Sequence, residues 1–376
     1  MIRIRSWVIG ACALALAGGT ARADDEIERI GANGRITRVR GKINAETPAK
    51  VEITTAAGDE EVPVFEIANV RYDQQPTELA QVRAQLEQQR YDEALETLKT
   101  LYERVKDTRQ EFLKASLLFQ VLRTQHLIAK ADESKIDAAL ATEAEFRAAF
   151  PRSRHDHRVD EIVGELALAK RDFARAKKAF ANLRAVEWPG YRERAMVFEG
   201  LAFLEEGDAA GAITNFDIVL AAPDSPAIKE HKLAAQVFKA EAMLKNAKDA
   251  KRGAEIEKML RAALAATPAE NKLVKALGHN ALGDSLRLQK KPPMETLMEG
   301  YFYNVVLYNE DGRQLARALY NAQDLFKQLG QTDRQETYAR ELRTKFPDSP
   351  WTKKLPAGVG GGGAAEAAAG GGAESN

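Results

Sequence analysis

His155, Asp156 and His157 form a local cluster of residue types that often bind metals. Two histidines separated by one residue can contact the same metal ion from an extended loop. A zinc site takes three or four protein ligands, however, and no further ligand stands near this cluster in the sequence. The cluster follows residues 150–153, in a connection between predicted helices where exposed polar residues and helix caps are expected. We therefore predict a solvated cap and no metal site.

Three other histidines, His126, His231 and His279, stand alone in predicted helices. A histidine acts as a catalytic base only beside a nucleophile and a carboxylate that orients it. The sequence LGDSL around Ser285 lacks the second glycine of a hydrolase nucleophile elbow. We therefore predict that these histidines lie on helix surfaces and that the protein is not an enzyme. An enzyme whose acting residue the sequence does not reveal stays as an alternative.

The C-terminal residues match the dinucleotide-binding fingerprint in glycine spacing alone, at Gly358, Gly360 and Gly363. The fingerprint needs a preceding strand and a following helix, because these elements point backbone amides at a pyrophosphate. The glycine and alanine around it predict neither element. We predict no cofactor, and a disordered tail over residues 353–376.

The N-terminal residues have the order of a signal peptide. Arg3 and Arg5 precede an apolar run over residues 7–17, and small residues ending at Ala23 supply a signal peptidase site. The run is shorter than the roughly 20 apolar residues that span a bilayer. We predict a signal peptide over residues 1–23, cleaved after Ala23, and export to the periplasm or cell envelope. A lipoprotein anchored at Cys12 is the alternative.

Cleavage after Ala23 has two consequences for the mature chain. It removes Cys12, the only cysteine, and with it disulfides, thiolate metal sites and cysteine nucleophiles. The full chain holds 55 basic and 55 acidic residues, so losing the three arginines of the leader leaves a net charge of about −3. No general attraction to nucleic acid or anionic membranes follows, and we expect no nucleic-acid partner.

Residues 24–75 alternate between apolar and polar side chains, which predicts short β-strands. Val39, Gly41 and Ile43 share one face of the clearest strand, and turn signals separate it from its neighbours. A small barrel hides the edges that an isolated sheet would expose. In its strand spacing the region resembles SH3-like and Sm-like barrels.

Arg38, Arg40 and Lys42 share the opposite face of that strand. Three interpretations of this basic face stay open: a solvated surface, a site for an anionic envelope polymer or lipid headgroup, and a nucleic-acid site. Export disfavours the last of these.

Residues 76–352 follow the helical period and contain an internal repeat. The stretch GELALAKRDFARAKKAFANL from Gly164 matches GLAFLEEGDAAGAITNFDIV from Gly200 at an offset of 36 residues, with Phe180 opposite Phe216. These stretches resemble tetratricopeptide repeats, which implies stacked helix pairs forming an α-solenoid. Gly200 then allows close approach between the two helices of its pair. About seven pairs are predicted, over residues 77–105, 110–151, 156–186, 191–222, 228–268, 271–309 and 313–347.

The resemblance implies a groove along the first helices of the pairs, suited to a protein or peptide partner. The repeated asparagines and lysines with which the family grips peptides are absent here. By register with the strong repeats, nine residues are expected to face the groove: Arg83, Arg158, Glu161, Glu165, Arg194, Leu201, Tyr320, Asp324 and Lys327.

The aromatic stretch over residues 301–309 is predicted to lie mostly in the core, with Tyr301, Val305 and Tyr308 on one helical face. Tyr303 and Leu307 project elsewhere and are candidates for a binding surface.

The sequence therefore predicts a mainly α protein, with a tetratricopeptide-like solenoid behind a small β-barrel. The ending KFPDSPW at residues 345–351 is similar to that of bacterial envelope tetratricopeptide proteins, including those that work with the Tol-Pal system and outer-membrane protein assembly. That resemblance implies an exported scaffold that binds an envelope protein, with possible cell-wall or peripheral membrane association. The alternative is an adaptor whose basic face, Arg38, Arg40 and Lys42, binds an anionic polymer or headgroup.

Overall fold

The computed structural model describes residues 24–31 and 34–359. The predicted signal peptide with Cys12, and residues 360–376 of the predicted tail, lie outside the described residues. The chain divides into two compact units: residues up to 45 together with 51–75, and residues 46–50 together with 76 onward. Each unit is described by itself. No helix in the described ranges is long and apolar enough to cross a membrane.

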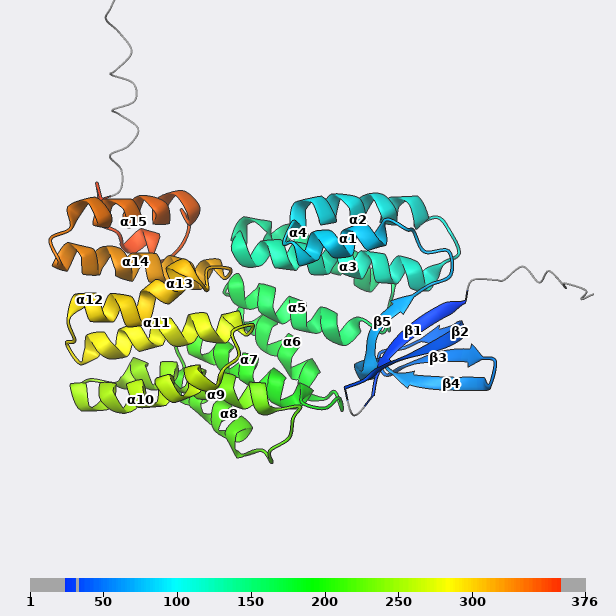
Figure 1. Cartoon of the computed structure of the whole chain (residues 1–376), viewed down its shortest axis with the longest axis horizontal. Coiled ribbons are helices and arrows are strands. Elements are labelled where there is room, and N and C mark those ends of the chain that lie inside the picture. Colours follow the sequence, from blue (N-terminus) through cyan, green and yellow to red (C-terminus); the bar gives the residue numbers. More distant parts are fainter. Residues whose placement is uncertain (1–23, 32–33, 360–376) are drawn as a thin grey trace, which may run out of the picture. The chain divides into compact units, whose positions relative to one another are not determined.

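The first unit is a five-stranded antiparallel sheet, which confirms the predicted small β domain (Figure 1). Its strands are β1 (Asp25–Ile30), β2 (Ile36–Glu46), β3 (Lys50–Thr55), β4 (Gly58–Pro63) and β5 (Ile67–Arg71). They lie in the order β4-β3-β2-β1-β5, and the 3-10 helix Val64–Glu66 connects the two edge strands.

The alternation in β2 places its apolar residues inside this unit. Ile43 and Gly41 are buried, Val39 is half-buried, and the three basic residues between and beside them are exposed. A side chain at Gly41 would collide with the backbone oxygen of Thr54 on β3. Glycine therefore permits the close approach of the two strands.

The second unit consists of helix pairs, as predicted. Among the described residues there are seven consecutive pairs: α1 (Leu79–Glu87) with α2 (Tyr91–Val105), α3 (Glu111–Ala131) with α4 (Ile136–Ala149), α5 (Asp156–Ala169) with α6 (Phe173–Arg184), α7 (Tyr191–Glu206) with α8 (Ala209–Ala221), α9 (Lys229–Asn246) with α10 (Ala250–Ala266), α11 (Lys272–Leu288) with the segment α12 (Pro293–Thr296), η3 (Leu297–Tyr301) and α13 (Phe302–Val306), and α14 (Gly312–Gln328) with α15 (Thr332–Lys345). The segment η3 is a turn of π-helix.

A glycine of the first helix faces an aromatic ring of the second helix in the two pairs that the sequence match revealed. A Cβ atom at Gly200 would lie 2.5 Å from Cε1 of Phe216, and one at Gly164 would collide with the ring of Phe180. Both rings are fully buried. The missing side chain therefore makes the space that the ring fills, which confirms the packing role predicted for Gly200.

Aspartates cap several of the second helices. Asp172 accepts a hydrogen bond from the backbone N–H of Arg175 at 3.1 Å, and Asp208 accepts one from Gly211 at 2.8 Å. Asp249 does the same for Arg252 at 2.8 Å. Such a cap is worth about 1 kcal/mol, because it satisfies an amide that the helix leaves unpaired.

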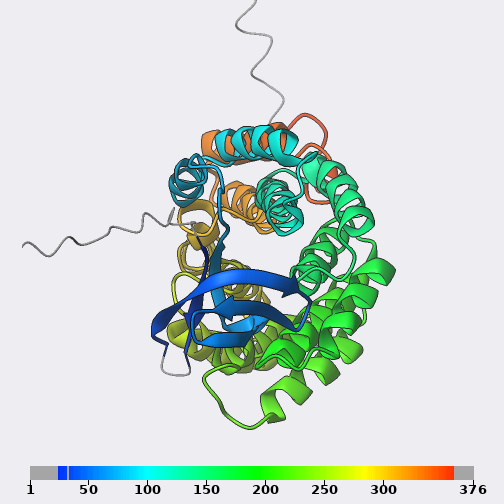
Figure 2. The same cartoon turned by 90° about the vertical axis from the view of Figure 1, so that its right-hand side faces the viewer.

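The solenoid coils so that its last pair returns to its earlier helices (Figure 2). A Cβ atom at Gly312, the first residue of α14, would lie 2.9 Å from the carbonyl oxygen of Ala131 at the end of α3. Arg313 and Arg317 of α14 also form ion pairs with α7 and α9, respectively. Helix α14 is consequently buried on most of its circumference.

The first residues of the predicted tail pack on the last helix pair. Leu355 is buried, and Arg343 of α15 donates hydrogen bonds to the carbonyl oxygens of Pro356 at 2.9 Å and Val359 at 2.7 Å. Residues 353–359 therefore have defined contacts.

Candidate functional site

One face of α7 lines three adjoining pockets inside the solenoid. Their volumes are about 540, 490 and 230 Å³. Successive pockets share lining residues, among them Phe198 and Leu201. The residues of α7 that line them recur every three or four positions: Arg194, Val197, Phe198, Leu201, Leu204 and Glu205. This spacing is one side of a helix, so the pockets follow α7 lengthwise as a channel.

The largest of these three pockets lies in the middle of the α7 channel. Its walls come from the C-terminal half of α3, from α5, from the connection before α11, and from the turn between α13 and α14. Phe198 and Leu201 of α7, with Leu273 of α11, give it an apolar side. A pocket of this size, apolar with a few placed polar groups, is typical of ligand sites.

Glu165 of α5 carries a charge at the wall of the middle pocket. Its carboxylate accepts hydrogen bonds from Nε2 of His126 at 3.1 Å and from Nζ of Lys130 at 2.9 Å. Burial opposes ionisation, but the charges and hydrogen bonds of Lys130 and His126 outweigh it and lower the pKa of Glu165. Burial lowers the pKa of Lys130, but the charge and hydrogen bond of Glu165 outweigh burial, so this pKa is raised. The pair is therefore ionised at neutral pH.

The second pocket begins at Arg194, near the N-terminal end of α7. Arg194 forms an ion pair with Glu161 of α5. His231 of α9 also lines this pocket, and burial together with the positive charge of Arg194 lowers its pKa to about 4. His231 is therefore neutral at pH 7.

Arg313 of α14 lies where the middle pocket meets the smallest one. Its guanidinium is 3.3 Å from the carboxylate of Glu205 on α7 and 3.5 Å from that of Asp311. Burial raises the pKa of Glu205 even though Arg313 acts in the opposite direction. This arginine joins the start of α14 to the end of α7 and closes one side of the channel.

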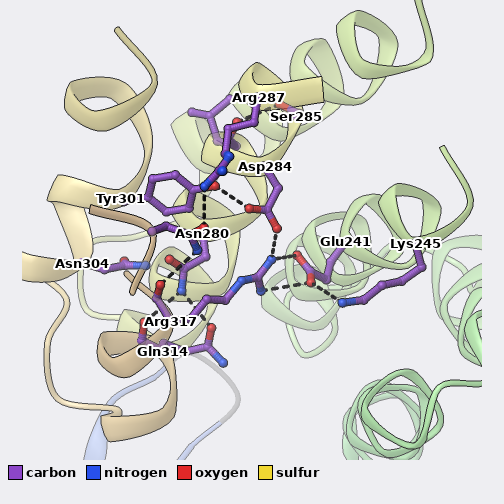
Figure 3. A network of polar contacts seen from close by, with 12 residues as sticks. Glu241, Lys245, Asn280, Asp284, Ser285, Arg287, Tyr301, Asn304, Gln314 and Arg317 are labelled. Carbon is purple, nitrogen blue, oxygen red and sulfur yellow. Dashed lines mark hydrogen bonds and ion pairs between the residues drawn. The ribbon is translucent and has the colours of Figure 1, made fainter. Parts of the chain in front are cut away.

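A buried network continues from there along α14. Figure 3 shows the guanidinium of Arg317 between the carboxylates of Glu241 on α9 and Asp284 on α11. The Arg317–Glu241 distance is 3.0 Å, and Tyr301 donates its hydroxyl to Asp284. Lys245 reaches Glu241 from the more exposed side, at 3.5 Å. The network fastens α14 to two other pairs and forms a wall of the smallest pocket.

The nine residues predicted to face the groove are distributed unevenly. Glu165, Arg194 and Leu201 line the α7 channel, and Glu161 lies behind it as the partner of Arg194. Arg158 is exposed at the start of α5. The structure therefore brings four of the five predicted residues of the middle repeats to the channel or directly behind it.

The other four predicted residues lie away from the pockets. Arg83 of α1 and Lys327 of α14 are exposed. Asp324 forms an ion pair with Arg287, with a nitrogen–oxygen distance of 2.6 Å. The ring of Tyr320 packs against that of Trp351, with centroids 5.3 Å apart.

Sequence reasoning missed Arg313 and Arg317, together with their carboxylate partners. The available signal was local: Arg313, Arg317 and Asn321 follow one another at steps of four among the alanines and leucines of this helix. Such a stripe indicates buried polar contacts on one helical face.

The predicted surroundings of several histidines were wrong. His126 and His279 are buried instead of lying on helix surfaces, and His231 is half-buried. His155, expected as a solvated cap, is buried and stacks on Phe119 with ring centroids 4.1 Å apart. Burial and the charge of Arg154 hold the pKa of His155 well below its usual value, so the neutral ring packs as an aromatic residue. Within the described residues no group of three or more His, Cys, Asp or Glu is placed to hold a metal ion.

The basic face of the β unit surrounds a carboxylate. Glu26 of β1, whose side chain is 5% exposed, lies 2.6 Å from Arg40, 3.3 Å from Arg71 and 3.7 Å from Arg38. The hydrogen bond from Arg40 lowers the pKa of Glu26, although burial opposes it. Lys42 is exposed further along the strand. Part of the positive charge seen in the sequence is thus neutralised within the sheet.

The fold is a tetratricopeptide-like solenoid of helix pairs preceded by a small β domain. No family model matches the chain, and no curated protein sequence matches it. Among solved structures, a tetratricopeptide repeat protein from Parabacteroides merdae ATCC 43184 is 12% identical, with a TM-score of 0.48, covering 73% of this chain and 94% of that one.

A second solved structure with a similar helical arrangement is PilW, described as a widely conserved type IV pilus biogenesis factor. It is 15% identical with a TM-score of 0.39, and the match covers 65% of this chain and 98% of PilW. Both likenesses are distant, so the fold assignment rests on the helix pairs and glycine contacts described above.

Proposed function

We propose that this protein is a non-enzymatic interaction scaffold of the bacterial cell envelope, which binds an extended segment of a partner protein in the α7 channel. The observation that carries the proposal is the single face of α7 that lines three adjoining pockets. Export through the leader at residues 1–23, with cleavage after Ala23, is part of the proposal.

The dimensions of the α7 channel fit a short extended peptide. From Arg194 to Glu205 the helix advances about 16 Å, at about 1.5 Å per residue. An extended chain rises about 3.3 Å per residue, so about five residues of a partner match this length. Phe198, Leu201 and Leu273 would contact an apolar side chain in the middle of that segment.

The charges of the middle pocket favour a basic residue beside that apolar one. Its lining contains five carboxylates against three lysine or arginine side chains. The three cations are all engaged: Lys130 with Glu165, Lys272 with Glu310, and Arg313 with Glu205. The excess of carboxylate supplies acceptors for a lysine or arginine of the partner. A partner segment with one apolar and one basic residue is therefore expected.

Site-specific photo-crosslinking in cells tests the proposal. A photo-reactive phenylalanine analogue replaces Leu273, which lines two of the pockets, or Ile218, which is exposed on α8 and serves as the control. We expect a discrete adduct with an envelope protein from position 273 and none from position 218. The same adducts from both positions, or none from 273, would reject the channel as the binding site.

Mass spectrometry of the crosslinked sample also reads the N-terminus of the mature chain. A mature start at Asp24 is the expected result. Recovery of cytoplasmic ribosomal or RNA-bound proteins as the only partners would reject export and the envelope function together.

A further inference from the structure

Three arginines occupy equivalent positions on the first helices of three successive pairs. They are Arg123 on α3, Arg158 on α5 and Arg194 on α7. The interval from Arg158 to Arg194 is 36 residues, which is the offset of the sequence repeat, and that from Arg123 to Arg158 is 35. Helix α5 contacts both α3 and α7, so the three arginines lie in adjacent layers of the solenoid. We call this row the arginine rim.

Each arginine of the rim stands seven residues before a residue that lines the middle pocket. The three lining residues are Lys130 of α3, Glu165 of α5 and Leu201 of α7. Seven residues are about two helical turns, so each arginine shares a helical face with its lining residue and lies about 10 Å from it along the helix axis. Arg194 also lines the second pocket. The arginine rim therefore lies on the channel side of α3, α5 and α7, at the Arg194 end.

The arginine rim carries more positive charge than its own carboxylate partner neutralises. Arg123 and Arg158 are exposed, and among the described residues Arg194 is the one member of the rim with an ion-pair partner, Glu161 of α5. Desolvation by the surrounding helices and then the charge of Arg158 lower the pKa of Arg123, while Glu161 acts in the opposite direction. An incoming anion would relieve this repulsion.

The rim also offers a hydrogen-bond donor that is not in use. Nε of Arg194 is buried and has no hydrogen-bond partner within the part of the chain that the structure describes. A buried donor without a partner costs free energy, which a ligand atom that accepts its hydrogen bond restores. Charge and hydrogen bonding therefore both favour an anionic group at the rim.

The carboxylates further along the channel decide which kind of anion fits. Glu230 and Glu270 line the second pocket together with Arg194, and carboxylates outnumber the cations of the middle pocket. A polyanion such as a nucleic acid would bring its next charges against these carboxylates. A protein segment avoids the repulsion, because it can carry an acidic residue at one position and a basic residue at another.

We propose that the arginine rim binds an aspartate or glutamate side chain of the partner segment. This inference deepens the proposed function and rests on it. The distance of about 10 Å from the rim to the middle pocket corresponds to about three residues of an extended chain. The acidic residue accordingly lies about three positions from the apolar residue that contacts Leu201, and it sets the direction in which the segment enters. Hydrogen bonds between guanidinium and carboxylate groups make this contact selective.

Peptide selection on the purified protein tests the proposal. A random heptapeptide library displayed on phage should yield peptides with an apolar residue next to a lysine or arginine, and with an acidic residue about three positions away. On Arg123→Gln/Arg158→Gln the acidic preference should disappear while the apolar–basic pair stays. Arg109→Gln/Arg192→Gln removes the same charge at two exposed positions outside the rim and should retain the full preference. Thermal unfolding verifies that both variants fold.

Fluorescence polarisation with the most enriched heptapeptide measures the contact itself. Changing its acidic residue to the amide should weaken binding to the wild type at least about tenfold, and should have little effect on binding to Arg123→Gln/Arg158→Gln. Equal losses on both proteins overturn the proposal.

The selection separates failure of the arginine rim from failure of the channel. Peptides that keep the apolar–basic pair but show no acidic preference overturn the role of the rim and leave the proposed function standing. A selection without any enriched peptide rejects peptide binding in the channel, and the rim contact with it. Tight binding of oligodeoxythymidylate that depends on Arg123 and Arg158 would assign the rim to a polyanion and also overturn the proposal.

Discussion

Gly283 of α11 lies against the ring of Tyr301, so that a Cβ atom on Gly283 would be 2.5 Å from Cζ of the tyrosine. The contact repeats that of Gly164 with Phe180 and of Gly200 with Phe216. In the sixth pair the two residues are 18 positions apart instead of 16, and this pair contains the π-turn. The same contact between a glycine and an aromatic ring therefore occurs in a helix pair whose repeat is not apparent in the sequence.

Gly200→Ala should destabilise the solenoid. Alanine favours a helix interior by about 1 kcal/mol, but here its methyl group would overlap the ring of Phe216, and overpacking of a core costs about 1–3 kcal/mol. Urea unfolding followed by circular dichroism measures the change. The double variant with Phe216→Leu, which makes room for the methyl group, should recover part of the loss. A simple sum of the two single effects would argue against the contact.

Arg317→Met should cost about 3–5 kcal/mol of folding free energy, because it leaves the buried carboxylate of Glu241 and the half-buried carboxylate of Asp284 without their shared cation. Lys245→Met is the matched control. Lys245 also pairs with Glu241, but its side chain is half exposed, so its removal should cost less than about 1 kcal/mol. Chemical unfolding of both variants decides. Equal losses would mean that Arg317 has no special part in fastening α14.

His279 should make stability depend on pH. Burial, followed by the charge of Lys275, lowers its pKa to about 4 in the folded state, although a backbone hydrogen bond acts in the opposite direction. Because the unfolded chain binds the proton near pH 6.5, this contribution is present above that pH and is lost as pH falls towards 4, up to roughly 3 kcal/mol.

His279→Phe keeps a ring under Tyr303 but cannot titrate, so its stability should fall less between pH 6.5 and 4 than that of the wild type. His231 still contributes to the slope, because its pKa is also lowered to about 4. His279→Gln separates titration from ring stacking. It cannot titrate, so it should flatten the pH dependence of stability as much as His279→Phe does. Because it lacks a ring under Tyr303, it should be less stable than His279→Phe at every pH. Thermal unfolding across this range gives the comparison, and parallel wild-type and His279→Phe curves would contradict the assignment.

Replacing Arg38, Arg40 and Lys42 by alanine should leave association with the envelope fraction and its salt dependence unchanged. Glu26 already offsets part of this charge within the sheet. Fractionation and a salt titration of the triple variant provide the measurement. A clear loss of binding with a shallower salt dependence would instead favour the adaptor whose β domain binds an anionic polymer or headgroup.

Local patterns sufficed to predict the elements of this fold. The period of apolar residues and the N-caps at Asp172 and Asp208 determine where helices pair. The alternation of apolar and polar residues through Ile43 determines which side of β2 is buried. Both signals extend over a few residues only, which is why the sequence displays them directly.

The channel depends on contacts that no local pattern encodes. Arg313 reaches Glu205 across 108 residues, and Arg317 reaches Glu241 across 76. The burial of His279 similarly depends on Tyr303 in the next helix segment, which the π-turn displaces from its ordinary helical register. The repeat register therefore placed Glu165, Arg194 and Leu201 along the channel but could not indicate where α14 would return.

The contact of Gly312 with the end of α3 also bears on how the solenoid loses its structure. In a linear array each repeat touches only its neighbours, and the terminal repeats fray first. Here the last pair is attached both to its neighbour and to the second pair, so its release must break two boundaries at once. The last pair is therefore not a free end of the array. The seven pairs are expected to unfold in one cooperative transition instead of one pair at a time from the C-terminal side.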